Sequence, residues 1–122
     1  MKKILIVDDQ PEVRELVEVT LRVGDFKILQ AENGPKALKI ARAEKPELIL
    51  LDVMMPEGGM DGLEVCEQLK KDPETAGITI IMLTAKGQEI DKERGNQVGA
   101  DDYFTKPFSP LKLINKVEEV LG

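Results

Sequence analysis

The stretch KILIVDD (residues 3–9) decides the fold, because a short apolar run rich in β-branched residues ends at two carboxylates, Asp8 and Asp9. A second apolar run, LILLDVMMP (residues 48–56), reaches its first charged group at Asp52. Both acidic positions lie where a β-strand would stop. If the two strands are neighbours in a parallel sheet, their carboxylates meet at one edge of that sheet.

A third stretch, DYFTKPF (residues 102–108), would bring a cation, Lys106, to the same edge. Three carboxylates gathered there repel one another, since two of them ~4 Å apart cost on the order of 4 kcal/mol at a surface-like dielectric. Folding alone gives no reason to accept that cost. A bound divalent cation together with a phosphoryl group would give one.

Strand and helix signals alternate along the chain. Strands are expected at residues 3–7, 27–31, 48–51, 78–83 and 102–105. Helices are expected to begin near Pro11, Asn33, Asp61, Gln88 and Ser109. The first helix should carry its apolar positions at Val13, Leu16, Val17, Thr20 and Leu21, and the last at Leu111, Leu113, Ile114, Val117, Val120 and Leu121. The helix expected over 88–98 has the poorest apolar stripe.

Such alternation predicts a single α/β domain over residues 1–122, with a parallel sheet and helices on both faces. For five strands the first choice is the flavodoxin-like (βα)5 arrangement with strand order 2-1-3-4-5. Its ligand crevice lies at the carboxyl ends of strands 1 and 3, where the strand order reverses. Those are the two strands that end in the aspartates.

Composition excludes several classes of function. The formal net charge of −6 argues against a nucleic-acid or anionic-membrane surface. The absence of histidine excludes histidine-based triads, histidine metal sites and a role as a phosphohistidine carrier. A lone cysteine, Cys66, permits no intrachain disulfide and indicates a cytoplasmic protein. No stretch has the length of a membrane span, and the apolar part of the N-terminus is too short for a signal peptide.

Six segments together resemble a receiver domain of the two-component response regulators, of the chemotaxis-regulator type. They are ILIVDD (4–9), ENGPKAL (32–38), PELILLDVMMP (46–56), MDGLEV (60–65), IIMLTAK (80–86) and GADDYFTKPF (99–108). They occur in the family's order and span nearly the whole chain. A single one would be weak support, whereas all six at consistent spacing are specific.

The resemblance implies a role for each matching position. Asp52 would be the phosphoacceptor. Mg²⁺, or Mn²⁺, would be held by Asp8, Asp9, Asp52 and the backbone carbonyl of Met54. The phosphoryl oxygens would be bound by the Thr84 hydroxyl, the Ala85 backbone amide and the Lys106 ammonium.

The resemblance also implies a conformational switch. Thr84 and Tyr103 would respond to phosphorylation and alter the surface of helix 4, strand 5 and helix 5, which is also the surface for a possible dimer. The Lys106–Pro107 peptide bond is expected to be cis. The phosphoryl donor would be a sensor histidine kinase or a histidine phosphotransfer protein, and the output an attached domain or a separate protein. Direct binding of nucleic acid or membrane is not expected.

One departure from the family pattern is visible. The loop MPEGGMDG (residues 55–62) is two residues longer than the family's usual form.

Three rival functions remain. A phosphohydrolase of the haloacid dehalogenase type usually has a second acid two residues after its nucleophile, where this chain has Met54. A flavin carrier needs a phosphate loop after strand 1, where this chain has the acidic DDQPEV (residues 8–13). The last rival is a receiver that has lost phosphorylation, which the complete set of side chains disfavours.

Overall fold

The computed structural model describes residues 1–53, 60–85, 98–106 and 109–121, with only the backbone described at residues 85 and 106. Its elements are β1 (Lys2–Val7), α1 (Pro11–Leu21), β2 (Phe26–Ala31), α2 (Gly34–Glu44), β3 (Leu48–Asp52), α3 (Gly62–Lys71), β4 (Thr79–Ala85), β5 (Asp102–Lys106) and α5 (Pro110–Leu121). The helix expected over 88–98 lies outside the described residues except for Val98, as do Met54 and Pro107.

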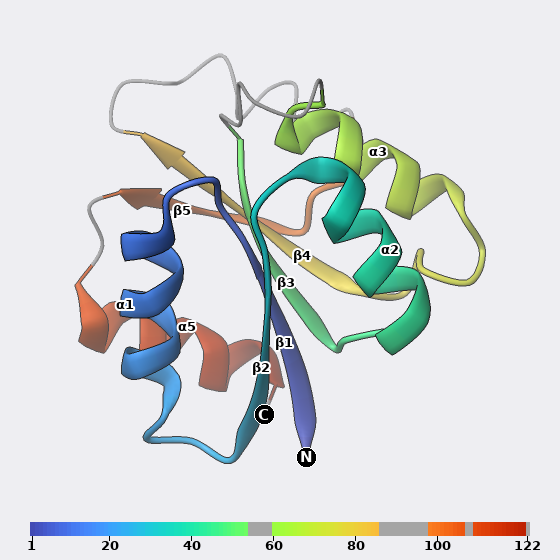
Figure 1. Cartoon of the computed structure of the whole chain (residues 1–122). Coiled ribbons are helices and arrows are strands. Elements are labelled where there is room, and N and C mark those ends of the chain that lie inside the picture. The colour runs from blue at the N-terminus through green and yellow to red at the C-terminus, as the bar shows by residue number, and fades with distance from the viewer. Residues whose placement is uncertain (54–59, 86–97, 107–108, 122) are drawn as a thin grey trace.

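The five strands form one sheet in the order β2-β1-β3-β4-β5, and every neighbouring pair is parallel. This confirms the expected strand order and the flavodoxin-like fold. The order reverses between β1 and β3, so the chain leaves these two neighbouring strands in opposite directions (Figure 1). The carboxyl ends of β1 and β3 therefore lie side by side at the point where the strand order reverses.

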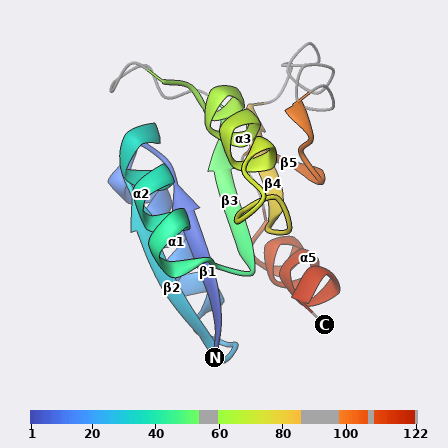
Figure 2. The same cartoon turned by 90° about the vertical axis from the view of Figure 1, so that its right-hand side faces the viewer.

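Two layers of helices cover the sheet. Helices α1 and α5 pack on one face, and α2 and α3 pack on the other, as Figures 1 and 2 show from perpendicular directions. The central strands are buried on both faces: in β3, Ile49 and Leu51 face the α2–α3 layer, while Leu48 and Leu50 face the α1–α5 layer. This explains why the strand reads as a continuous apolar run.

Capping residues fix where helices α2 and α3 begin. Asn33 and Asp61 each accept a hydrogen bond from a backbone N–H three residues on, in both cases at 2.9 Å. These bonds satisfy donors that would otherwise lack a partner at a helix N-terminus. The N-caps of α2 and α3 thus match the expected starting points.

Two apolar positions differ from the expectation. Leu16 is 49% exposed and Leu111 is 66% exposed, although both were assigned to apolar helix faces. In α1 the fully buried apolar positions are Val17 and Leu21, four residues apart, and Leu16 falls on the flank of that stripe. Helical spacing therefore identified the right helix but too wide a buried face.

No described helix is both long and apolar enough to cross a bilayer.

Candidate metal centre

The candidate site lies where β1 and β3 end side by side. The register pairs Val7 with Leu51, so the next residues, Asp8 and Asp52, reach the sheet edge at the same level. Asp9 follows in the turn that leads into α1. The sheet topology thus brings together two segments that are more than 40 residues apart in the sequence.

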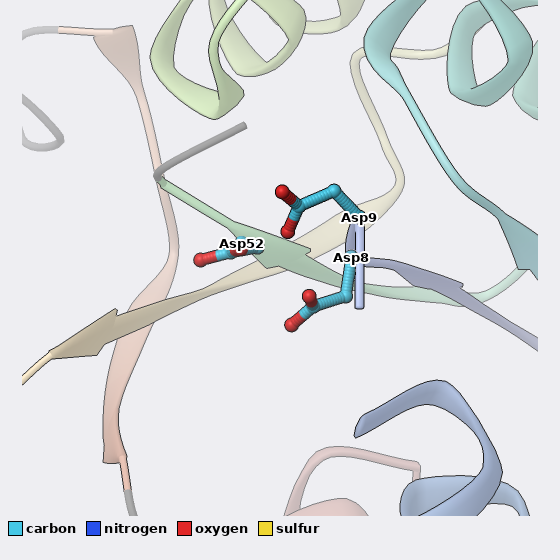
Figure 3. Close-up of side chains that lie close together, drawn as sticks. All are labelled: Asp8, Asp9 and Asp52. Carbon is cyan, nitrogen blue, oxygen red and sulfur yellow. The ribbon is translucent and has the colours of Figure 1, made fainter. Parts of the chain in front are cut away.

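One carboxylate oxygen from each of Asp8, Asp9 and Asp52 lies within 4.8 Å of the others. Figure 3 shows the three side chains close together, with Asp52 at the end of β3 and with Asp8 and Asp9 just after β1. Asp8 is fully buried, Asp52 is 6% exposed and Asp9 is half-buried. The acidic cluster expected from the sequence is present in the structure.

The donor set suits a hard divalent cation. Mg²⁺ takes oxygen ligands at about 2.1 Å in an octahedron, so neighbouring ligands lie about 3 Å apart and opposite ones about 4 Å. Oxygens that already lie within 4.8 Å of one another need only small movements to reach that geometry. The three carboxylates therefore fit the expected Mg²⁺ or Mn²⁺.

Asp8 is held in place by hydrogen bonds with β2, with the residue before α1 and with α1 itself. Its backbone N–H donates to the carbonyl of Ala31 in β2 at 3.2 Å. Its Oδ1 accepts from the backbone N–H of Gln10 at 2.9 Å. Its carbonyl accepts from Nη1 of Arg14 in α1 at 2.7 Å. An aspartate side chain is short, so fixing its backbone in this way largely fixes its carboxylate.

Asp52 is held by the continuing β3–β4 ladder and by the start of α3. The N–H of Val53 donates to the carbonyl of Leu83 at 3.1 Å, and the N–H of Gly62 donates to the carbonyl of Val53 at 3.0 Å. The segment after Asp52 is thus bonded on one side to the sheet and on the other to a helix N-terminus.

The phosphoryl-binding positions expected from the family lie on the neighbouring strands. Asp52 pairs with Leu83, so Thr84 lies one residue beyond it on β4, where it is 2% exposed. The backbones of Ala85 and Lys106 pair with each other at the same edge. The ammonium of Lys106, the carbonyl of Met54 and the Lys106–Pro107 bond belong to parts outside the described residues.

Tyr103 lies on β5 and packs, partly buried, against the α2–α3 core that contains Cys66. Burial raises the pKa of Tyr103, and the charges of Cys66 and Asp102 act in the same direction. On the neighbouring residue, the Asp102 carboxylate accepts a 2.8 Å hydrogen bond from Lys116 of α5. Tyr103, the expected switch residue, therefore packs against the α2–α3 core and directly follows the residue that binds Lys116 of α5.

Sequence reasoning missed two residues that shape the site, Arg14 and Gly62. A cation in the first turns of a helix opposes the helix dipole, so Arg14 carried a signal that it has a specific partner. Gly62 follows a capping aspartate at a place where a better helix former would be favoured, which signals a close approach.

Comparison with known proteins identifies the family to which this fold belongs. The family model for the response regulator receiver domain matches residues 4–118, and the chain belongs to that family. Phosphorylation of an aspartate is the general function of the family. The phosphate regulon transcriptional regulatory protein PhoB of Pseudomonas aeruginosa is 49% identical over 120 residues, which cover 98% of this chain and 52% of that protein.

The alkaline phosphatase synthesis transcriptional regulatory protein PhoP of Bacillus subtilis is 46% identical, over 98% of this chain and 48% of its own length. This chain spans about half the length of these curated relatives. Among solved structures, a putative response regulator from Chloroflexus aurantiacus superposes with a TM-score of 0.91 at 36% identity, covering 98% of this chain and 97% of that one. The chemotaxis response regulator CheY4 of Vibrio cholerae gives 0.90 at 32% identity, covering 98% of each chain.

Proposed function

We propose that residues 1–122 are a receiver domain in which Asp52 accepts a phosphoryl group from a phosphohistidine on a partner protein, in a reaction that depends on Mg²⁺. The observation that supports this is the convergence of Asp8, Asp9 and Asp52 within 4.8 Å at the point where the strand order reverses. The donor is a sensor histidine kinase or a histidine phosphotransfer protein, because this chain has no histidine of its own.

The chemistry is a phosphoryl transfer between two side chains. A carboxylate oxygen of Asp52 forms a bond to phosphorus as the bond from phosphorus to the donor imidazole nitrogen breaks, and the product is an acyl phosphate. Catalysis of such a transfer consists mostly of positioning and of neutralising charge on the equatorial oxygens. We assign the binding of the phosphoryl oxygens to the Thr84 hydroxyl, the Ala85 backbone amide and the Lys106 ammonium.

The metal would be held by Asp8, Asp9, Asp52 and the Met54 carbonyl. When bound, it neutralises charge on the phosphoryl oxygens and on the carboxylate cluster. The need to bind this metal gives a reason for the fold to keep three carboxylates so close together.

The acyl phosphate would act on the rest of the domain through Thr84 and Tyr103. Thr84 is buried and directly follows Leu83, the partner of Asp52 on β4. A phosphoryl oxygen on Asp52 can therefore accept a hydrogen bond from the Thr84 hydroxyl and pull it closer. Movement of Thr84 changes the space available to Tyr103 on the adjacent strand. The resulting change in β5, α5 and the segment 86–98 would alter the surface offered to an output domain, an output protein or a second copy of the chain.

The domain acts as a signalling module, and the only reactions we assign to it are its own phosphorylation and dephosphorylation. Relatives that are about twice as long are transcriptional regulatory proteins. We infer that the full protein couples this domain to an output function of that kind, with nucleic acid bound by the output part and not by this acidic domain.

Labelling by acetyl phosphate tests the assignment of Asp52. We expect wild-type protein to be phosphorylated with Mg²⁺ and not with EDTA. Asp52→Asn should abolish labelling, and Asp25→Asn, which removes the same charge at an exposed position, should not. Retained labelling of the Asp52→Asn protein would move the acceptor elsewhere. Turnover of an external phosphomonoester would instead favour a hydrolase.

A further inference from the structure

The side chain of Arg14 joins three elements beside the candidate metal centre. Its Nη1 donates to the backbone carbonyl of Asp8 at 2.7 Å, and its Nε donates to Oε1 of Gln30 in β2 at 3.2 Å. Arg14 itself belongs to α1 and is half-buried. The rigid guanidinium thus spans the end of β1, the edge strand β2 and the first helix.

The hydrogen bond from Arg14 reaches the backbone at the start of the turn that carries the carboxylates of Asp8 and Asp9. Asp8 is the first residue after β1, and the β1–β3 pairing stops one residue before it. The N–H of Asp8 still bonds to the carbonyl of Ala31 in β2, and the turn into α1 begins directly after Asp8. The hydrogen bond from Arg14 to the Asp8 carbonyl adds a second restraint on the backbone where that turn begins.

We propose that Arg14 is a positioning residue for the metal centre: it orients the Asp8–Asp9 turn so that both carboxylates face Asp52 at the spacing that Mg²⁺ requires. This inference rests on the proposed function, because it assumes that the carboxylate cluster binds a metal. It adds a residue that contacts neither metal nor phosphoryl group and acts only through the backbone of Asp8.

Charge and geometry make opposite predictions for this residue. The guanidinium is a cation held against the backbone of a metal ligand, so by charge alone it repels Mg²⁺. Its removal would then tighten metal binding. If Arg14 positions the carboxylates, its removal weakens metal binding despite the loss of repulsion. The sign of the change in affinity therefore separates the two roles.

The choice of substitution sharpens this distinction. Arg14→Lys keeps the charge but loses the planar fork that reaches two acceptors on different strands. Arg14→Met removes both the charge and the planar guanidinium. Gln30→Ala leaves Arg14 intact and removes only its anchor on β2, at an exposed side chain. Lys39→Met removes one cation from the exposed face of α2 and serves as the matched control, since Lys39 has no ion pair with any described residue.

The experiment titrates ¹⁵N-labelled proteins with MgCl₂ and, separately, with CaCl₂, and follows the amide shifts of residues 7–10. Changes in residues that support metal ligands typically cost 10–100-fold in affinity, so we expect Arg14→Met to weaken Mg²⁺ binding by about tenfold. Arg14→Lys should weaken it by several-fold and Gln30→Ala by about twofold, while Lys39→Met should match wild type.

Calcium supplies a readout that general destabilisation would not move. Ca²⁺ accepts irregular geometry and longer bonds, whereas Mg²⁺ demands a near-ideal octahedron. Misplaced carboxylates should therefore weaken the binding of Mg²⁺ more than that of Ca²⁺. The dissociation constant for Mg²⁺ divided by that for Ca²⁺ should rise in both Arg14 variants. Thermal unfolding in EDTA checks that each variant is folded, and Arg14→Lys and Gln30→Ala carry the test if Arg14→Met is not.

The outcomes separate this inference from the proposed function. Wild-type protein that shows no saturable Mg²⁺ binding would remove the metal centre itself. Wild-type binding that is unchanged or tighter in Arg14→Met would overturn the role of Arg14 alone. Equal weakening of Mg²⁺ and Ca²⁺ in both Arg14 variants would also overturn it, because that pattern indicates a general loss of structure.

Discussion

A Cβ atom placed on Gly62 would lie 2.0 Å from the backbone carbonyl oxygen of Asp52. Helix α3 therefore begins in direct contact with the backbone of the candidate phosphoacceptor, and only glycine allows that approach. The same glycine donates its N–H to Val53 at 3.0 Å. The first turn of α3 and the end of β3 are fitted to each other as one unit.

Gly62→Ala should therefore destabilise the domain. The added methyl group would meet backbone atoms, which cannot rotate away as a side chain can, and overpacking of this kind costs about 1–3 kcal/mol. Urea denaturation measures the loss. Gly77→Ala is the control, because nothing lies within 4 Å of a Cβ at that position, and it should leave stability unchanged or slightly higher. Equal stability of the two variants would contradict the contact with Asp52.

Much of this site could be predicted from the sequence because it depends on where strands end. Asp8 and Asp52 each follow an apolar run, and parallel strands place their carboxyl ends at one edge. The contacts of Arg14 and Gly62 were not predictable in the same way. Each joins positions from separate elements, and their distances depend on the sheet register and on how closely a helix approaches a strand. The exposed flank of α1 at Leu16 was missed because helical spacing gives the direction of a face but not its width.

The thiol of Cys66 should be inert in the folded protein. Its pKa is raised from 9.0 to about 11, mainly by burial; the charge of Lys70 opposes this rise and the charge of Asp101 adds to it. We expect no reaction with a disulfide reagent at mildly alkaline pH in the native state, and rapid reaction in denaturing urea. Fast labelling of the native protein would show that the α3 layer opens readily.

The same shift predicts a loss of stability in alkali. A thiol whose pKa is higher in the folded state favours folding below its unfolded pKa, and this contribution disappears as pH rises from about 9 to about 11. Cys66→Ala removes this titration. The difference in unfolding free energy between wild type and Cys66→Ala should therefore fall across that window, as urea titrations at a series of pH values would measure. A constant difference would contradict the buried-thiol assignment.

The Asp102–Lys116 pair should contribute modestly and only above acidic pH. Burial raises the pKa of Asp102, but the Lys116 hydrogen bond, the Tyr103 N–H and the Lys116 charge outweigh it, so the net pKa lies below the ordinary value of 3.8. A carboxyl group with a lowered pKa stabilises the fold above its unfolded pKa and loses that contribution as pH falls. The Asp102 side chain is 42% exposed, so solvent screening limits the effect to about 0.5 kcal/mol.

Lys116→Met should accordingly cost less than 1 kcal/mol near neutral pH, on the order expected of a half-exposed ion pair. The cost should shrink as pH falls below about 4, where the carboxyl group becomes protonated in both states. Chemical denaturation across this pH range measures it. A cost that persists at low pH would indicate that Lys116 acts through packing of its stem and not through the ion pair.

Asp9 should lower the stability of the metal-free protein and raise that of the metal-bound protein. Its carboxylate oxygen lies within 4.8 Å of those of Asp8 and Asp52. Mutual repulsion at such spacing costs between about 1 and 4 kcal/mol per pair, depending on the local dielectric. Asp9→Asn keeps the shape of the side chain and removes one charge. In EDTA we therefore expect this variant to be more stable than wild type by about 1 kcal/mol, at the lower end of that range because Asp9 is half-buried.

Magnesium should reverse the order. A ligand that binds only the folded state adds about 2.7 kcal/mol at a concentration 100 times its dissociation constant. Wild-type protein should gain stability in this way, whereas Asp9→Asn has lost a charged ligand and should gain less, so the two stability curves cross as MgCl₂ is added. Asp25→Asn, at an exposed position, should follow wild type throughout. Asp9→Asn protein that is less stable than wild type in EDTA would show that the carboxylate supports the fold by itself, and the argument that a metal explains the cluster would lose its energetic basis.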